Sequence, residues 1–492
     1  MNERSVRAIG PRSRGFDMPE GWLLLAAGLV WLGFAAAGGP LRALVAGVVG
    51  RVSVAAGVGV LLYPGDLRVV SFGAIASLLG LATAVLGVFA FGLGTSLGLA
   101  VLAVLGWLAA GRVSLAWTPP TNHVPAREDS LRLAAQVAMD EALLASFHLR
   151  LDFPAGPRLD AVARDAIALG ELLADRGLLE KPLAYHRPPP PLETALSERA
   201  HTGSIDYEHV AFPSEWEPLA EAPGRDRWLD IEHNRTAHAY VVRRDPKAPW
   251  LVAINGYRMG FAAIDLRLFD PRIYCDRLGL NLVVPVLPLH GPRRIGRFSG
   301  DGYLDGDPVV FAHAEAQAIW DLRRIVSWVR AQGAERVGVL GLSLGGYNPA
   351  LLACVEDELA CAIAGIPVSD FSRIMWTHGP AWLTRSLEQH GLTREQLGTW
   401  LRPVSPLALE PRVERAMLAV FGGTGDRIVP PEHQRDLVDH WQPARHCWYQ
   451  GGHVTFRLDP AVDAMVRATL RERLLGAEPV AAPAASSAAR SA

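Results

Sequence analysis

The sequence predicts an α/β fold with a doubly wound, mostly parallel sheet, preceded by an N-terminal module of transmembrane helices. Two observations lead to this prediction. Residues 21–116 carry very few charged side chains, although 20% of the whole chain is charged. Beyond about residue 238, short apolar runs alternate with helical patterns. This alternation is typical of a parallel sheet covered by helices on both faces.

The charge-poor segment is long enough for about four membrane spans, and we assign the transmembrane module to residues 1–116. About 20 apolar residues in a helix cross a hydrocarbon core roughly 30 Å thick. Spans are expected at 22–38, 41–63, 69–91 and 93–111, with a hairpin at 92–96 between the last two. The charged residues between positions 21 and 116 are Arg42, Arg51, Asp66, Arg68 and Arg112.

Arginine placement predicts the orientation of this multi-pass module. With four spans, Arg68 and Arg112 fall on the same side as the N-terminal arginines, and Arg42 falls on the other side. Lysine and arginine favour the cytoplasmic side of a membrane. The domain that follows the module is therefore expected in the cytoplasm. The N-terminal arginines are Arg4, Arg7, Arg12 and Arg14.

Residues 117–237 are predicted to form a linker and packing helices. Asp129 or Ser130 can cap a helix that runs to about residue 147, and a second helical pattern covers 157–176. The proline-rich stretch 182–224 predicts an extended connector. The main α/β domain is predicted over 238–474, and the Ala-, Pro- and Ser-rich residues 475–492 are expected to be a disordered tail.

Apolar runs bounded by turn residues predict the strands of the α/β domain. The segment 371–410 separates two of these runs and is rich in Trp and Leu, so it is expected to form a helical lid. The expected strands are 238–243, 250–254, 281–287, 336–341, 361–366, 416–421 and 445–449.

Ser343 is the candidate nucleophile, because residues 341–345 (GLSLG) match the pattern G-x-S-x-G between a strand and a helix. That turn lifts the serine hydroxyl above the sheet. The alternative is a glycine-rich phosphate-binding turn, but the Lys-Ser/Thr of a P-loop does not follow. Residues 94–98 match the same pattern around Ser96, but they lie in the apolar hairpin with no strand before them.

A serine needs an imidazole to accept its proton and a carboxylate to orient that imidazole. His453 follows the last expected strand in the sequence Gln-Gly-Gly-His, and glycines there leave the loop free to reach the serine. Asp426 lies after the strand at 416–421, in the sequence GTGDRIVP. Asp370, after the strand at 361–366, is the alternative orienting residue.

Two backbone amides are expected to form an oxyanion hole. Leu344 directly follows the nucleophile, and Tyr257 lies in the loop after the strand at 250–254. Neither a metal nor a cofactor is expected. The cysteines contain no C-x-x-C pair, so a zinc site or a disulfide framework is not predicted. They are Cys275, Cys354, Cys361 and Cys447.

With GLSLGG, GTGDRIVP and GGH in that order, residues about 238–474 resemble the α/β-hydrolase superfamily. The resemblance implies an eight-stranded fold and hydrolysis of an ester, thioester or amide. Its oxyanion loop usually begins His-Gly, whereas this chain has Asn255-Gly256. That departure puts the loop-orienting hydrogen bonds in question, but the backbone donor is unaffected. The resemblance covers none of residues 1–130.

The expected partners are the membrane and a small-molecule ester or lipid-like substrate, because an anchor and an apolar lid favour an apolar substrate. His290 and Arg293 follow the strand at 281–287 and are candidates for binding a polar substrate group; pairing with nearby acids is the alternative. A net charge of −2 gives no reason to expect nucleic acid. The pattern fits acyl transfer as well as hydrolysis. A membrane scaffold that keeps the fold without turnover is the alternative function.

Overall fold

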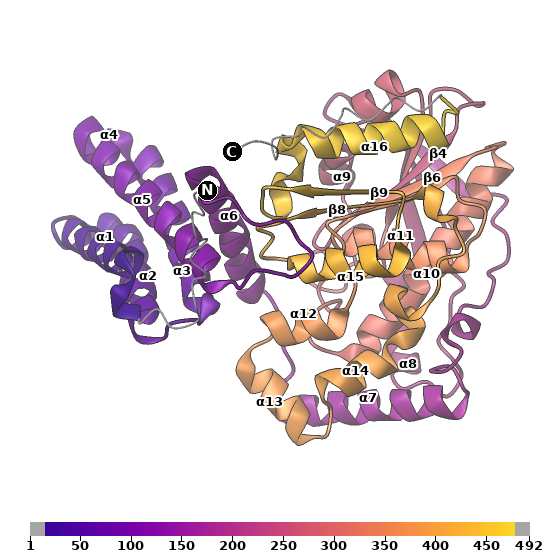
Figure 1. Ribbon diagram of the computed structural model, residues 1–492, viewed down its shortest axis with the longest axis horizontal. Helices are drawn as coiled ribbons and strands as arrows, with labels where there is room; N and C mark the ends of the chain where they lie inside the picture. Colours follow the sequence, from indigo (N-terminus) through magenta and orange to yellow (C-terminus); the bar gives the residue numbers. More distant parts are fainter. Residues whose placement is uncertain (1–14, 478–492) are drawn as a thin grey trace, which may run out of the picture.

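The computed structural model describes residues 15–477, and a nine-stranded sheet forms its centre (Figure 1). The strand order is β1-β2-β3-β5-β4-β6-β7-β8-β9. From β5 to β9 all neighbours are parallel, and β1, β2 and β3 add antiparallel pairs at one edge. The strands are β1 (Leu196–Thr202), β2 (Ile205–Pro213), β3 (Thr236–Val242), β4 (Trp250–Ile254), β5 (Asn281–Val286), β6 (Val337–Leu342), β7 (Cys361–Gly365), β8 (Leu418–Gly423) and β9 (Arg445–Tyr449).

Helices cover both faces of this sheet, as the doubly wound pattern predicts. The helices α10, α11 and α15 pack on one face in one apolar cluster, and α9 and α16 pack on the other. The central strands β4, β5, β6, β7 and β8 are buried along their whole length because both faces are covered. The covering helices are α9 (Ala262–Leu268), α10 (Pro308–Ala331), α11 (Leu344–Val355), α15 (Pro431–Trp441) and α16 (Pro460–Arg473).

The expected lid is helical. It lies between β7 and β8 and rests on α7 (Pro157–Asp175), where Gly170 leaves room for the Trp400 indole. The small helix α8 (Arg225–Leu229) precedes β3. The lid helices are α12 (Phe371–His378), α13 (Ala381–Gln389) and α14 (Arg394–Trp400).

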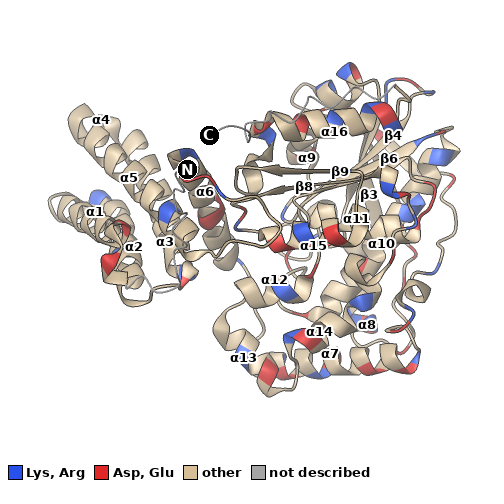
Figure 2. Cartoon of the chain, in the orientation of Figure 1, with Lys and Arg blue, Asp and Glu red and all other residues tan. Residues whose placement is uncertain are grey.

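Four N-terminal helices are long and apolar enough to cross a membrane. In Figure 2 they are almost free of charged residues, whereas the α/β domain carries both signs. Glycines allow α1 and α2 to pack closely: a Cβ at Gly57 would lie 2.5 Å from the amide nitrogen of Leu25. The four helices are α1 (Pro19–Ala36), α2 (Pro40–Leu62), α3 (Leu67–Leu86) and α5 (Leu93–Trp117), with the short α4 (Val88–Phe91) before the last.

The turn between the last two spans differs from the expected hairpin at 92–96. Helix α3 ends at Leu86, and the chain turns through Gly87 and Gly92, so Thr95 and Ser96 lie inside α5. Gly92 adopts φ 78°, which explains why the chain reverses there and not three residues later. The arginines at positions 4, 7, 12 and 14, and residues 478–492 of the expected tail, lie outside the described residues.

The prediction of an extended connector over 182–224 is corrected by the structure, because residues 196–213 form β1 and β2 of the sheet. Strand β2 buries Val210 and Phe212 and pairs along β3, so the domain begins well before residue 238. Gly203 at φ 59° makes the tight β1–β2 turn. The hairpin was not predicted because the prolines at 188–191 suggested an extended connector.

The segment 117–130 is also more closely attached than a free linker. The Gln450 side-chain amide donates to the Ala126 carbonyl at 3.0 Å and accepts from the Glu128 amide at 3.1 Å. Thr121 donates to Glu432 of α15 at 2.8 Å. Helix α6 (Leu131–His148) then packs between the membrane-type helices and the α/β domain.

Candidate active site

Ser343 lies in a strained turn between β6 and α11. Its backbone adopts φ 62° and ψ −121°, a conformation that non-glycine residues rarely hold. The turn is possible because its neighbours have no side chains: a Cβ at Gly341 would lie 1.8 Å from the Gly345 carbonyl oxygen, and one at Gly345 would lie 2.2 Å from the Ile254 carbonyl oxygen. The strand-to-helix turn required of a nucleophile is therefore present.

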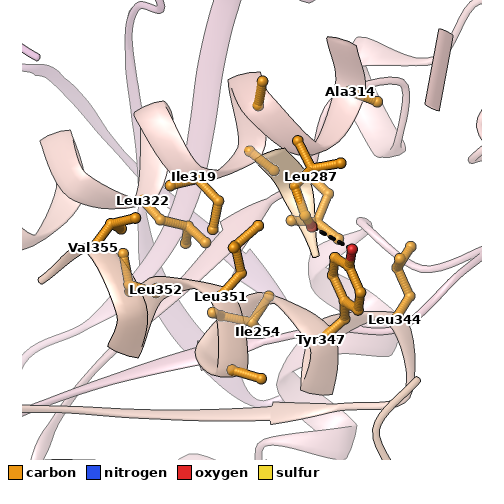
Figure 3. Close-up of a cluster of buried hydrophobic side chains, with 14 of the residues drawn as sticks. Ile254, Leu287, Ala314, Ile319, Leu322, Leu344, Tyr347, Leu351, Leu352 and Val355 are labelled. Atoms are coloured by element: carbon orange, nitrogen blue, oxygen red, sulfur yellow. Dashed lines mark hydrogen bonds between the residues drawn. The ribbon is translucent and has the colours of Figure 1, made fainter. Parts of the chain in front are cut away.

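The sheet and its core hold this turn from below. The Ser343 amide donates to the Gly365 carbonyl of β7 at 2.9 Å. Helix α11 then buries Leu351 and Leu352 against α10, and the Tyr347 hydroxyl donates to the Val404 carbonyl (Figure 3). The turn that carries the candidate nucleophile is therefore attached to the buried core of the domain.

Asp426 and His453 are hydrogen-bonded to each other. Asp426 Oδ2 and His453 Nδ1 lie 2.7 Å apart, and both side chains are buried. The other Asp426 oxygen accepts from the amides of Ile428 and Val429 at 3.0 and 2.8 Å. These bonds fix the carboxylate, which in turn leaves Nε2 of His453 as the ring nitrogen free to act as a base.

The surroundings of His453 raise its pKa above the ordinary value of 6.5. Burial acts to lower the pKa, but the charge and hydrogen bond of Asp426, together with the charge of Asp140, outweigh it. An imidazole in this setting holds a proton more firmly than a free histidine. That is the property a group needs if it takes a proton from a serine during a reaction.

Ser343 and His453 line the same cavity. No hydrogen bond joins their side chains among the described residues; hydrogen bonds of this kind are often long without substrate and shorten when it binds. Because β4 and β6 pair in parallel with Ile254 opposite Gly341, the loop after β4 lies beside the serine. A Cβ at Gly256 would lie 3.3 Å from that of Ser343.

The two expected oxyanion donors belong to segments that adjoin Ser343. Leu344 is the first residue of α11, where backbone amides have no helical acceptor, and Tyr257 follows Gly256 in the neighbouring loop. The buried Asp265 carboxylate accepts from the Gly260 amide at 3.0 Å, and the Tyr240 hydroxyl donates to the Gly260 carbonyl at 2.9 Å. These two bonds support the loop from behind.

The cavity above Ser343 has a volume of about 580 Å³ and is mainly apolar. Its walls come from α6, the loop after β4, α10 and the lid helices. A cavity of this size accommodates a small organic ligand or a medium-length acyl chain. Apolar residues that line it include Leu143, Phe147, Phe311, Phe371, Met375 and Leu397.

His290 and Arg293 do not line this cavity, which corrects the expectation that they bind substrate. Arg293 is fully buried, pairs with Asp321 at 2.8 Å and donates to the carbonyls of Val286 and Asn234. His290 is buried behind Tyr257, with Nδ1 2.9 Å from the Pro288 carbonyl oxygen. Burial with local partners makes them structural residues of this loop.

The alternative candidates occupy other environments. Asp370 caps α12 by accepting from the Arg373 amide at 3.1 Å. Ser96 is buried inside the apolar helix α5, far from any strand end. Within residues 15–477, no cluster of His, Cys, Asp and Glu is arranged to hold a metal ion.

Two acidic residues of α6 that sequence reasoning missed also contact the site. Asp140 accepts from the amides of both His453 and Arg427, and Glu141 pairs with the Arg427 side chain. Both acids are buried in α6. The signal in the sequence was an Asp-Glu pair within an otherwise apolar helical stretch, which we had assigned only to packing.

Comparison with known proteins places the same residues in a family context. A model of the prolyl oligopeptidase family matches residues 317–463, the part that contains Ser343, Asp426 and His453. An uncharacterized protein of Mycobacterium tuberculosis strain CDC 1551 / Oshkosh is 35% identical over 353 residues, 71% of this chain and 85% of that protein. Its counterpart in strain H37Rv is 34% identical over the same extent.

Solved structures with similar folds include esterases and peptidases. Acetyl xylan esterase 1 from a Thermoanaerobacterium species is 16% identical, with a TM-score of 0.42, over 60% of this chain and 92% of that one. The acylaminoacyl peptidase of Pyrococcus horikoshii is 14% identical, with a TM-score of 0.38, over 56% of this chain and 47% of that one.

Proposed function

This chain belongs to the α/β-hydrolase superfamily and to one family with the two mycobacterial proteins, and we propose that it is a membrane-anchored serine hydrolase. Its proposed substrates are lipid-like or acyl esters. The observation that carries the proposal is the arrangement of Ser343 and the Asp426–His453 pair around one apolar cavity.

The proposed reaction proceeds through an acyl-enzyme. Ser343 Oγ attacks the ester carbonyl carbon while His453 Nε2 takes the serine proton, and Asp426 stabilises the resulting imidazolium. The amides of Leu344 and Tyr257 stabilise the oxyanion. The imidazolium then protonates the leaving alcohol. A water molecule, deprotonated by His453, then attacks the acyl-enzyme carbonyl; the imidazolium returns the proton to Ser343 Oγ as the acid leaves.

The cavity supports an apolar acyl group as the recognised part of the substrate. Its lining is mainly apolar, with a few polar side chains such as His378 and Arg457. An ester with a medium-length acyl chain would gain from burial of each methylene group, by about 0.8 kcal/mol. A peptide would bring several backbone hydrogen-bonding groups into this apolar space, and their burial would cost free energy.

A fluorophosphonate probe tests the proposal without knowledge of the natural substrate, because it reacts with activated serines. The full-length protein is expected to be labelled and to hydrolyse p-nitrophenyl esters. Chain lengths from acetate to palmitate, beside a peptide p-nitroanilide, separate esterase from peptidase activity. A folded protein that neither reacts with the probe nor cleaves any ester would support the scaffold alternative instead.

Membrane anchoring by α1, α2, α3 and α5 is part of the proposal, with the catalytic domain on the cytoplasmic side. It is supported by the length and apolar character of the four helices. Arg112 pairs with Glu20 at 3.0 Å, so the end of α5 and the start of α1 lie on the same side of the bundle. We expect the protein to resist extraction from membranes by alkaline carbonate. In right-side-out vesicles the catalytic domain should be protected from added protease.

A further inference from the structure

Helix α6 separates the membrane-type helices from the two loops that carry the catalytic acid and base (Figure 1). On one side it meets α5 so closely that a Cβ at Gly111 would lie 1.8 Å from the Ala134 carbonyl oxygen. On the other side it meets the acid loop, where a Cβ at Gly425 would lie 2.9 Å from Leu133. Helix α6 is therefore in close contact with its neighbours on both faces.

Asp140 joins the acid loop and the histidine loop through one oxygen atom. Its Oδ2 accepts from the His453 amide at 2.7 Å and from the Arg427 amide at 3.0 Å. Its other oxygen, Oδ1, is buried and has no partner among the described residues. Arg427, which directly follows Asp426, and His453, which carries the imidazole, are thus bonded through their amides to the same atom of α6.

Glu141, the next residue, connects the acid loop to the membrane-type helices. Oε1 accepts from Arg427 Nε at 2.9 Å and from the Ser114 hydroxyl of α5 at 2.6 Å. Oε2 accepts from the Ser71 hydroxyl of α3 at 2.5 Å. Glu141 and Arg427 are both buried, so water does not compete for these contacts.

We propose that Asp140 and Glu141 are positioning residues that hold the catalytic acid and base in register with Ser343 and tie that register to helices α3 and α5. The inference rests on the proposed serine-hydrolase function. It identifies α6 as the part through which the membrane helices act on catalysis, although they touch neither Ser343 nor His453.

The geometry shows what the loss of Asp140 would change. Without its carboxylate, the His453 amide and the Arg427 amide both lose a buried acceptor, and nothing else on α6 replaces it. The imidazole would then move relative to a serine that is held independently by the sheet. A displacement of about 1 Å in a catalytic group can reduce turnover by roughly 10²-fold.

Hydrogen-bond acceptance, more than charge, is the feature of Asp140 that this role requires. Burial and the charge of Asp426 raise the pKa of Asp140 to about 7, so the carboxyl is not a firmly ionised group. Asparagine keeps one side-chain oxygen of the same shape, and its amide group can occupy the place of the unpartnered Oδ1. Asp140→Asn is therefore the conservative variant, and Asp140→Ala the disruptive one.

The first experiment compares these two variants of the full-length protein in phospholipid nanodiscs with a p-nitrophenyl ester at pH 8.5. Asp140→Ala is expected to lower kcat by about 10²-fold with KM little changed, because the cavity walls are intact. Asp140→Asn should retain most of the wild-type kcat. Equal kcat for Asp140→Ala and wild type, or a rise in KM with kcat preserved, would overturn the proposal.

Gly452→Ala keeps this test decisive if Asp140→Ala does not fold. Its Cβ would lie 2.7 Å from Asp140 Oδ2, so it pushes the histidine loop away from α6 without removing any polar group. Its φ of −86° is acceptable for alanine. The same selective loss of kcat is expected, and unchanged kcat in a folded Gly452→Ala protein would count against the proposal.

The second experiment tests the connection to the membrane helices. Ser71→Ala with Ser114→Ala removes both hydroxyls that bind Glu141 and leaves the Glu141–Arg427 pair. Ser77→Ala is the matched control, because this buried serine of α3 donates only within its own helix, to the Gly73 carbonyl at 2.9 Å. The double variant should lose kcat and the control should not. If the two behave alike, the connection to α3 and α5 is wrong.

The outcomes separate this inference from the proposed function. If wild-type protein neither reacts with the fluorophosphonate nor cleaves esters, the function itself fails. If wild type is active and Ser343→Ala is inactive, the function stands, and only the α6 variants decide the positioning role.

Discussion

The loop that carries Ser343 is supported by the sheet beneath it, whereas the loops that carry Asp426 and His453 also bond to a helix from outside the sheet. The serine amide bonds to β7, and glycines fit its turn against β4. The histidine and acid loops bond to each other at the ends of β8 and β9, and both also bond to Asp140 of α6. On the proposed function, the difference implies that the nucleophile is held by the shared fold, while the position of its base also depends on the part of the chain that precedes the fold.

Removal of the proposed nucleophile should have the largest effect of all the variants. A smaller effect would contradict the assignment of Ser343 to this role. Ser343→Ala is expected to lower turnover by about 10⁶-fold, as loss of the nucleophile does in a comparable triad. Fluorophosphonate labelling should disappear as well. Ser96→Ala is the control, since it changes the other G-x-S-x-G serine within α5. Labelling that persists without Ser343 would remove the basis of the proposed function.

Loss of the orienting carboxylate ranks second. Asp426→Asn should reduce kcat by about 10⁴-fold, because the amide favours the wrong imidazole tautomer. The fold should be retained, as circular dichroism can verify. Asp370→Asn is the matched control, since the Asp370 side chain caps α12 and accepts from the Ser372 hydroxyl, without a contact to His453. A larger loss with the control would transfer the orienting role to Asp370.

The pH dependence of kcat/KM should show a smaller effect, and it tests the surroundings of His453. His453 acts as a base when neutral, and its raised pKa means that this form is lost on acidification at a pH above the ordinary value of 6.5. The acid limb of kcat/KM should therefore lie above pH 6.5. Asp140→Asn removes one of the charges that raise the pKa, so the limb should move to lower pH. A limb at or below 6.5 in wild type would contradict this.

The smallest catalytic effect is expected on the serine side. Tyr347→Phe leaves the buried Val404 carbonyl without its donor, and such a loss costs about 1–3 kcal/mol of unfolding free energy. We expect kcat to remain near wild type, because backbone contacts hold Ser343. Thermal unfolding and ester turnover measured on the same sample check both parts. A fall in kcat comparable to that of Asp140→Ala would make the two sides of the site equivalent.

Local sequence signals predicted the sheet from β3 onward, the lid, the four long apolar helices and the residues at the ends of β6, β8 and β9. Each of these follows from a periodicity or from a glycine-rich turn. The β1–β2 hairpin was missed because the prolines at 188–191, just before it, led to the prediction of an extended connector for the whole stretch 182–224. His290 and Arg293 were assigned to substrate because a sequence does not show that Asp321 lies beside Arg293.

The role of Asp140 and Glu141 was beyond prediction for a related physical reason. Asp140 lies 313 positions before its partner His453, so no spacing rule connects them. Two acids in an amphipathic helix are ordinarily exposed. Only the packing of α6 between two other bodies buries them and gives them partners.

The position of α6 also has a consequence for biosynthesis. At about 5–20 residues per second, His453 is translated roughly 15 to 60 seconds after Asp140. By then α1, α2, α3 and α5 have left the ribosome and can already be in the bilayer. If the four helices insert as proposed, the late loops find their support on a helix that is already attached to an anchored bundle. On the proposed function, the acid and the base would then reach their places only after the membrane helices have been inserted.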